Sequence, residues 1–69
     1  MKSKFAQRLY ELRQDRNLSQ DAVAKAIGVS QKSVDFWEKG ISEPKLTYIS
    51  RLALFFGVTS DYLIGIKDD

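Results

Sequence analysis

The stretch from Leu18 to Gly40, LSQDAVAKAIGVSQKSVDFWEKG, limits the possible folds most, because it predicts two short helices joined by a tight turn. Gly28 follows a helical run, at the position where a left-handed residue ends a helix without a Cβ clash. Ser19 and Ser30 precede the two helical segments, and a serine hydroxyl at such a position accepts an amide of the first turn. A helix, a glycine turn and a capped helix of this length form the helix-turn-helix pattern.

The second of these helices, from about Ser30 to Lys39, has two different faces when its residues are placed on a helical wheel. The face expected to pack against the rest of the chain carries Ser33, Val34, Trp37 and Glu38. The opposite face carries Gln31, Lys32, Asp35, Phe36 and Lys39. One side of the helix can therefore anchor it while the other stays free to contact a partner.

Apolar spacing predicts three further helices, over residues 3–16, 46–56 and 60–64, with Thr59 as the cap of the last. The helix before the glycine turn, residues 19–27, is expected to bury Val23, Ala24 and Ile27. The other expected core residues are Phe5, Leu9, Leu12, Leu46, Ile49, Leu52, Ala53, Phe56 and Leu63. We therefore expect an all-α, compact five-helix fold that forms one domain over residues 1–69, with its core within about 5–65.

Five separate segments of the chain resemble the lambda-repressor and Cro-like (XRE) family of helix-turn-helix transcriptional regulators, in order and in spacing. They are Leu18-Ser19-Gln20, Ile27-Gly28-Val29-Ser30, Trp37-Glu38-Lys39-Gly40, Glu43-Pro44 and Asp61-Tyr62-Leu63. The resemblance extends over nearly the whole chain and implies a compact five-helix domain that binds double-stranded DNA. It also implies a two-fold dimer on a near-palindromic site.

The composition argues against several other classes of protein. The chain contains neither cysteine nor histidine, so it lacks the thiolate ligand, the commonest general base and the commonest metal ligand. We therefore expect no enzyme activity, no metal and no cofactor. No run approaches the roughly 18 apolar residues of a membrane span, and no secretory signal is recognisable. We expect a cytoplasmic protein, encoded by a bacterium or a phage.

Four residues on the free face of the second motif helix are candidate base readers. An α-helix fits the major groove, where glutamine pairs with adenine and lysine donates to guanine, so Gln31 and Lys32 are the leading candidates. Asp35 can accept from cytosine, or it can repel phosphate and so exclude wrong sites. Phe36 can cover a thymine methyl group, or it can belong to a protein interface.

A second group of polar residues is expected to contact the DNA backbone. The candidates are Gln20, Ser30, Lys39, Ser42 and Lys45. For Gln20, the resemblance implies a phosphate contact and a bracing contact to Gln31. Ile41 and Glu43 make the following loop less basic than is typical of the family. A single copy is therefore expected to bind weakly.

The charges of the first helix suggest two roles. Residues 1–16 hold five bases and two acids, whereas the net charge of the whole chain is only +2. The positive electrostatic field is therefore expected to be confined to the first helix. Arg13 lies at the edge of the apolar stripe of its helix, and Glu38 lies on the buried face of the second motif helix. We expect an ion pair between them, which the resemblance also implies. The alternative is two unconnected surface charges.

Large apolar side chains outside the core stripes predict a contact surface. Leu54 points away from the core stripe of its helix, with Tyr48 and Phe55 on the flanks. The candidate dimer surface comprises Tyr48, Leu54, Phe55, Ile64 and Ile66. The expected function is a repressor that occupies an operator as a dimer. The alternative is an antitoxin or anti-repressor whose Phe36 and Leu54 contact another protein.

Overall fold

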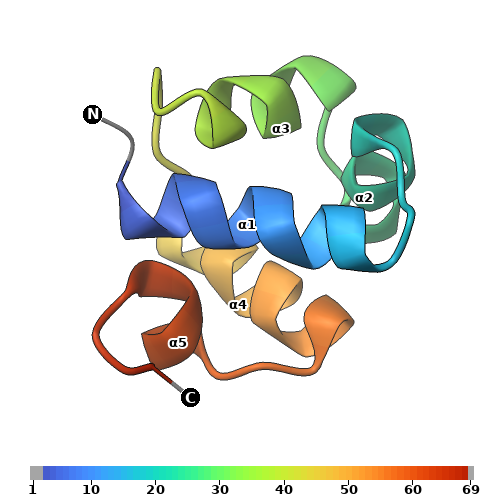
Figure 1. Cartoon of the computed structure of the whole chain (residues 1–69). Coiled ribbons are helices and arrows are strands. Elements are labelled where there is room, and N and C mark those ends of the chain that lie inside the picture. Colours follow the sequence, from blue (N-terminus) through green and yellow to red (C-terminus); the bar gives the residue numbers. More distant parts are fainter. Residues whose placement is uncertain (1–2, 69) are drawn as a thin grey trace.

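The computed structural model describes residues 3–68, which form five α-helices and no strand. The helices are α1 (Lys4–Asp15), α2 (Gln20–Ile27), α3 (Gln31–Glu38), α4 (Leu46–Phe56) and α5 (Ser60–Ile64) (Figure 1). The all-α architecture and the five helices confirm the expectation from the sequence. Of the expected domain, residues 1, 2 and 69 lie outside the described part. None of the described helices is long and apolar enough to cross a membrane.

The ends of the helices have the local geometry that the sequence predicts. The Ser19 hydroxyl accepts from the amide of Ala22 at 3.0 Å, and Ser30 accepts from that of Ser33 at 3.2 Å. Gly28 has a φ of 82° and closes α2 in the left-handed conformation. Because only glycine adopts this conformation without strain, the turn between α2 and α3 is fixed by local chemistry.

The core lies where the five helices meet (Figure 1). Helix α1 packs against α3 and α5, α2 packs against α3 and α4, and α4 packs against α5. The buried apolar cluster consists of Phe5, Leu9, Val23, Ala24, Ile27, Val34, Trp37, Leu52, Ala53, Phe56 and Leu63. Leu12 and Ile49, also expected in the core, are partly buried against it. Helix α3 is therefore held at the surface by contacts with both α1 and α2.

Arginine side chains donate hydrogen bonds to main-chain carbonyls at the carboxyl ends of three helices. Arg16 of α1 donates to the carbonyl of Phe56 at the end of α4, at 2.5 Å. Arg51 of α4 donates to the carbonyl of Ile27 at the end of α2, at 3.0 Å. Arg8 of α1 donates to a carbonyl in the last turn of α5. The last carbonyls of a helix lack the usual intrahelical partners, and a cation also interacts favourably with the negative end of the helix dipole.

The expectation that Leu46 lies in the core is wrong. Its side chain is 75% exposed, although it shares the apolar stripe of α4 with Leu52, which is fully buried. Leu46 is the first residue of α4, and helical side chains tilt towards the amino end of their helix. The side chain therefore points away from the core cluster, which lies against the later turns of α4.

The burial of α4 predicts a contrast between these two leucines. Leu52→Ala leaves a cavity in the core and should lower the free energy of unfolding by about 2 to 5 kcal/mol. Leu46→Ala removes an exposed side chain and should change it by less than about 0.5 kcal/mol. Urea unfolding followed by circular dichroism measures both values. Equal losses in the two variants would contradict the packing described for α4.

Candidate nucleic-acid interface

Helix α3 presents a polar face to solvent because its other face is anchored in the core. Val34 is fully buried and Trp37 is 5% exposed, whereas Gln31 and Lys32 are exposed. The ring of Trp37 also packs against that of Tyr48 on α4, with 6.1 Å between the ring centroids. The division between the two faces is the one that the helical wheel predicts. The side chains of Gln31 and Lys32 are therefore accessible to a partner.

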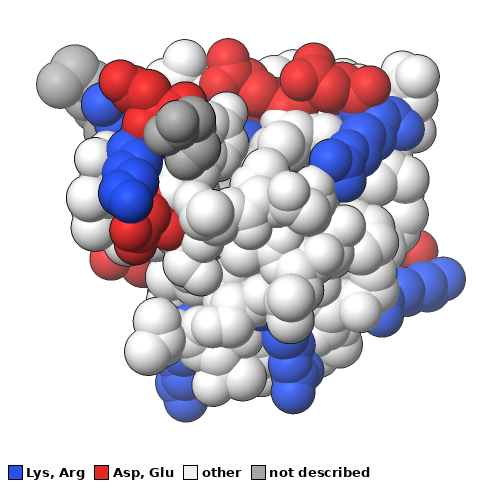
Figure 2. Space-filling view, turned by 90° about the horizontal axis from the view of Figure 1, so that it is seen from below, with Lys and Arg blue, Asp and Glu red and all other residues white. Residues whose placement is uncertain are grey.

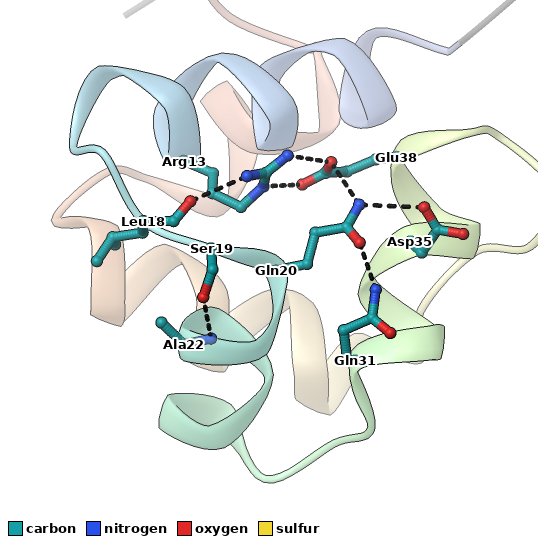
Figure 3. A network of polar contacts seen from close by, with 8 residues as sticks. All are labelled: Arg13, Leu18, Ser19, Gln20, Ala22, Gln31, Asp35 and Glu38. Carbon is teal, nitrogen blue, oxygen red and sulfur yellow. Dashed lines mark hydrogen bonds and ion pairs between the residues drawn. The ribbon is translucent and has the colours of Figure 1, made fainter.

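A buried ion pair joins α1 to α3 (Figure 3). The guanidinium of Arg13 donates from Nε to Oε2 of Glu38 at 2.6 Å and from Nη2 to Oε1 at 2.8 Å. The two side chains are only 10% and 4% exposed. Arg13 Nη1 also donates to the carbonyl of Leu18, so the same group holds the segment between α1 and α2. The hydrogen bond to Glu38 raises the pKa of Arg13 above its usual value.

Gln20, in the first turn of α2, connects this ion pair to the free face of α3 (Figure 3). Its Nε2 donates to Oδ1 of Asp35 and to Oε1 of Glu38, at 3.1 Å each. Its Oε1 accepts from Nε2 of Gln31 at 2.5 Å. The bracing contact to Gln31 is thus present in the structure. A chain of hydrogen bonds leads from a buried salt bridge to a candidate base reader.

Asp35 has partners on both carboxylate oxygens. Oδ1 accepts from Gln20, and Oδ2 lies 2.9 Å from Nζ of Lys39, one helical turn further along α3. The hydrogen bond from Lys39, and then that from Gln20, hold the pKa of the Asp35 carboxyl below its usual value. The carboxylate is therefore ionised at neutral pH. It neutralises the Lys39 ammonium, which was expected to contact phosphate.

The remaining candidates lie around this network. Phe36 is half-buried, and Nζ of Lys32 lies 5.5 Å from the centroid of its ring, within the range of a cation–π interaction. The Ser30 hydroxyl is engaged as the cap of α3 and also bonds the Ser33 hydroxyl at 3.0 Å. Ser42 and Lys45 are exposed in the loop that leads to α4.

The interface is less positive than the sequence suggests. Arg8, Arg13 and Arg16, three of the bases behind the expected field of the first helix, donate to carbonyls or to a carboxylate within the protein. The contact of Arg13 with Glu38 confirms the expected ion pair. The sequence gives no sign of the contacts of Arg8 and Arg16, because their acceptors lie 54 and 40 positions away along the chain. Within residues 3–68 no cluster of acidic residues that could hold a metal ion occurs.

A family model described as helix-turn-helix matches residues 9–63. The chain belongs to the helix-turn-helix family of transcriptional regulators. A transcriptional regulator of this type from Methanocaldococcus jannaschii is 38% identical over 53 residues, which are 77% of this chain and 80% of the relative. The match confirms the family that the sequence resembles.

Two further proteins support this assignment. The transcriptional repressor RstR of the cryptic phage CTXphi, from Vibrio cholerae, is 41% identical over 61 residues, or 88% of this chain and 55% of RstR. The chain thus spans little more than half the length of that relative. The P22 c2 repressor, solved in complex with a synthetic operator, superimposes with a TM-score of 0.86 at 25% identity, covering 91% of this chain and 96% of that one. All three proteins are named as transcriptional regulators or repressors.

The ion pair predicts strong coupling between Arg13 and Glu38. Arg13→Met or Glu38→Leu leaves the other charge buried without its partner and should cost about 3 to 5 kcal/mol of unfolding free energy. The double variant should lose clearly less than the sum of the two single losses. Urea unfolding of the four proteins gives the coupling energy.

The exposed pair of Lys25 and Asp21 on α2 provides a matched control. Its charged atoms lie 3.1 Å apart, but the two side chains are 79% and 56% exposed. Its coupling energy should stay below about 0.5 kcal/mol. A coupling for Arg13 and Glu38 that is as small as this would contradict the anchoring role of the buried pair.

Proposed function

We propose that the chain binds specific sites in double-stranded DNA through the exposed face of α3 and regulates transcription by occupying an operator. The observation that carries this proposal is the outward face of α3, on which the side chains of Gln31 and Lys32 are exposed while Val34 and Trp37 anchor the helix. A helix of this kind fits the major groove, where base pairs differ in their pattern of donors and acceptors. The repressor relatives RstR and P22 c2 support the same role.

Within this proposal the residues of the site have different tasks. Gln31 and Lys32 read base edges, and Phe36 covers a thymine methyl group beside them. Lys45 and Ser42, exposed in the loop after α3, contact phosphates. Asp35 has a partner on each carboxylate oxygen, so we assign it to holding its neighbours in place rather than to reading cytosine.

The proposed regulator acts as a dimer. The phosphate contacts of one copy are few, since Lys39 is paired with Asp35 and the arginines of α1 are used inside the protein. Figure 2 shows a broad uncharged face at the end that carries α4 and α5, with charged side chains towards its edges. Its exposed apolar residues include Leu54 at 83%, Ile66 at 70%, Phe55 at 40% and Ile64 at 39%. Tyr48, the fifth residue expected there, is half-buried beside Trp37. A dimer on a near-palindromic operator doubles the number of phosphate contacts. The proposed place of action is the bacterial cytoplasm.

Selection of binding sites from random DNA tests the DNA-binding proposal. We expect a preferred half-site, and Gln31→Ala should relax the preference at one base pair while leaving the fold intact. Lys45→Ala should weaken all sequences about equally and reduce the slope of log K against log salt by about 0.9. Fluorescence anisotropy at several salt concentrations measures both effects. Equal affinity of the wild-type protein for all sequences would contradict the proposal.

Sedimentation equilibrium tests the dimer separately. The wild-type protein should associate at micromolar concentration or on its operator, and Leu54→Lys should shift it to monomer, because the substitution places a charge in the contact surface. Leu46→Lys on the same helix is the matched control for an exposed leucine outside the proposed surface. A wild-type protein that stays monomeric even on operator DNA would contradict the dimer. It would favour the alternative in which the exposed apolar surface binds a different protein.

A further inference from the structure

Apolar side chains lie at the carboxyl end of α3, beyond the polar residues of its exposed face. Phe36, in the last turn of α3, is half-buried. Ile41, in the loop that follows, is 63% exposed. Neither side chain carries a hydrogen-bonding group. This end of the helix therefore cannot recognise a donor or an acceptor on a base, and it cannot bind a phosphate through these side chains.

The turn that ends α3 brings Ile41 back to Phe36. The amide of Ile41 donates to the carbonyl of Phe36 at 2.9 Å, and the amide of Gly40 donates to the carbonyl of Trp37 at 3.2 Å. Gly40 has a φ of 74°, in the left-handed region. These bonds form a Schellman motif, in which the residue after the glycine commonly packs against the residue that accepts from its amide. The backbone thus holds Phe36 and Ile41 together at one end of α3.

A cation lies beside the ring of Phe36. Nζ of Lys32 is 5.5 Å from the ring centroid, within the range of a cation–π attraction. The two residues are one helical turn apart and so are neighbours on the same face of α3. A lysine ammonium has three N–H donors, and contact with O6 and N7 of guanine uses two of them. Lys32 can therefore bind a guanine while it stays beside Phe36.

The bases differ in the apolar surface that they offer to Phe36. Thymine presents a C5-methyl group in the major groove, whereas cytosine presents its N4 donor and carries only a hydrogen at C5. A methyl group added to C5 of cytosine occupies the same place in the groove as that of thymine. Successive bases of a strand are about 3.4 Å apart along the helix axis. An ammonium and a ring in contact with each other can therefore reach two adjacent base pairs.

We propose that Lys32 and Phe36 act together on a two-base step, in which Lys32 binds guanine and Phe36 covers the C5-methyl group of an adjacent pyrimidine. Ile41 extends the apolar contact. Thymine or 5-methylcytosine supplies the methyl group, so the affinity of the protein responds to cytosine methylation of its site. This proposal rests on the proposed DNA binding and adds the chemical group of the DNA that is recognised.

Substitution of single bases in the selected site tests the methyl contact. Each thymine is replaced in turn by uracil, which differs from thymine only by the missing methyl group. At the responsive thymine, cytosine and 5-methylcytosine, each paired with guanine, are then compared in the same way. Burial of one methyl group should make binding about fourfold tighter in both comparisons, which corresponds to about 0.8 kcal/mol. Fluorescence anisotropy measures the affinities of the wild-type protein.

Two variants identify the side chain that is responsible. Phe36→Ala removes the ring, so both methyl ratios should fall to about one, and circular dichroism checks that the variant is folded. Lys45→Ala is the matched control, because loss of a phosphate contact should weaken all duplexes equally and leave both ratios unchanged. The wild-type comparison needs no variant and decides the methyl contact even if Phe36→Ala unfolds.

The contrary outcomes are distinct. Specific binding in which no thymine responds to loss of its methyl group, or a response that persists in folded Phe36→Ala, would overturn this proposal and leave the proposed DNA binding intact. The apolar end of α3 would then be available to a protein partner. A responsive thymine without a neighbouring guanine would overturn the joint action with Lys32. Equal affinity for all sequences would refute the proposed function together with this proposal.

The contact between Lys32 and Phe36 is also testable without DNA. Protons that lie over an aromatic ring shift upfield in an NMR spectrum. The ε-methylene protons of Lys32 should therefore resonate upfield of those of Lys25, which pairs with Asp21, and Phe36→Leu should remove the difference. Equal resonance positions of the two lysines in the wild-type protein would overturn the pairing, whether or not the protein binds DNA.

Discussion

The buried contact between Arg13 and Glu38 is the interaction on which the arrangement of α1, α2 and α3 depends. The guanidinium forms two hydrogen bonds to the carboxylate and a third to the carbonyl of Leu18, so one side chain ties three segments together. Removal of two charges from water is costly, and such a pair is tolerated only when the remaining donors and acceptors are satisfied. Here Gln20 donates to the same carboxylate, and no buried side-chain nitrogen or oxygen within residues 3–68 lacks a partner.

This satisfied network extends to the surface and there becomes part of the candidate interface. Asp35 and Gln31 both bond Gln20, and Lys39 closes the network at the next turn of α3. The polar groups on the free face are therefore ordered before any partner arrives, which reduces the entropy lost on binding. In the same network the positive charge of Lys39 is paired with the negative charge of Asp35. The contacts that order the side chains of the candidate interface therefore also weaken its positive electrostatic field.

The arginines of α1 likewise use their positive charge for contacts inside the protein. A chain of 69 residues has a small core, and helix ends leave carbonyls without partners. Arg16 donates to such a carbonyl at the end of α4, and Arg8 donates to a carbonyl in the last turn of α5. Basic residues that look like an electrostatic patch in the sequence thus stabilise the packing of helices. The proposed dependence on two copies for tight DNA binding is a consequence of this use of positive charge.

The sequence by itself determined the features that depend on local chemistry. The helix bounds follow from the serine caps, the left-handed Gly28 and the apolar spacing of each helix. The helical wheel of α3 places Trp37 and Gln31 on opposite faces, one buried and one exposed. The sequence also predicted the ion pair of Arg13 with Glu38, but only the tertiary structure decided which arginines meet which helix ends. The exposure of Leu46, the carbonyls closed by the arginines and the direction of the Gln20 amide depend on neighbours far away along the chain. Periodicity assigns a residue to a face of its own helix, whereas the partner of that face is fixed by the packing of other helices.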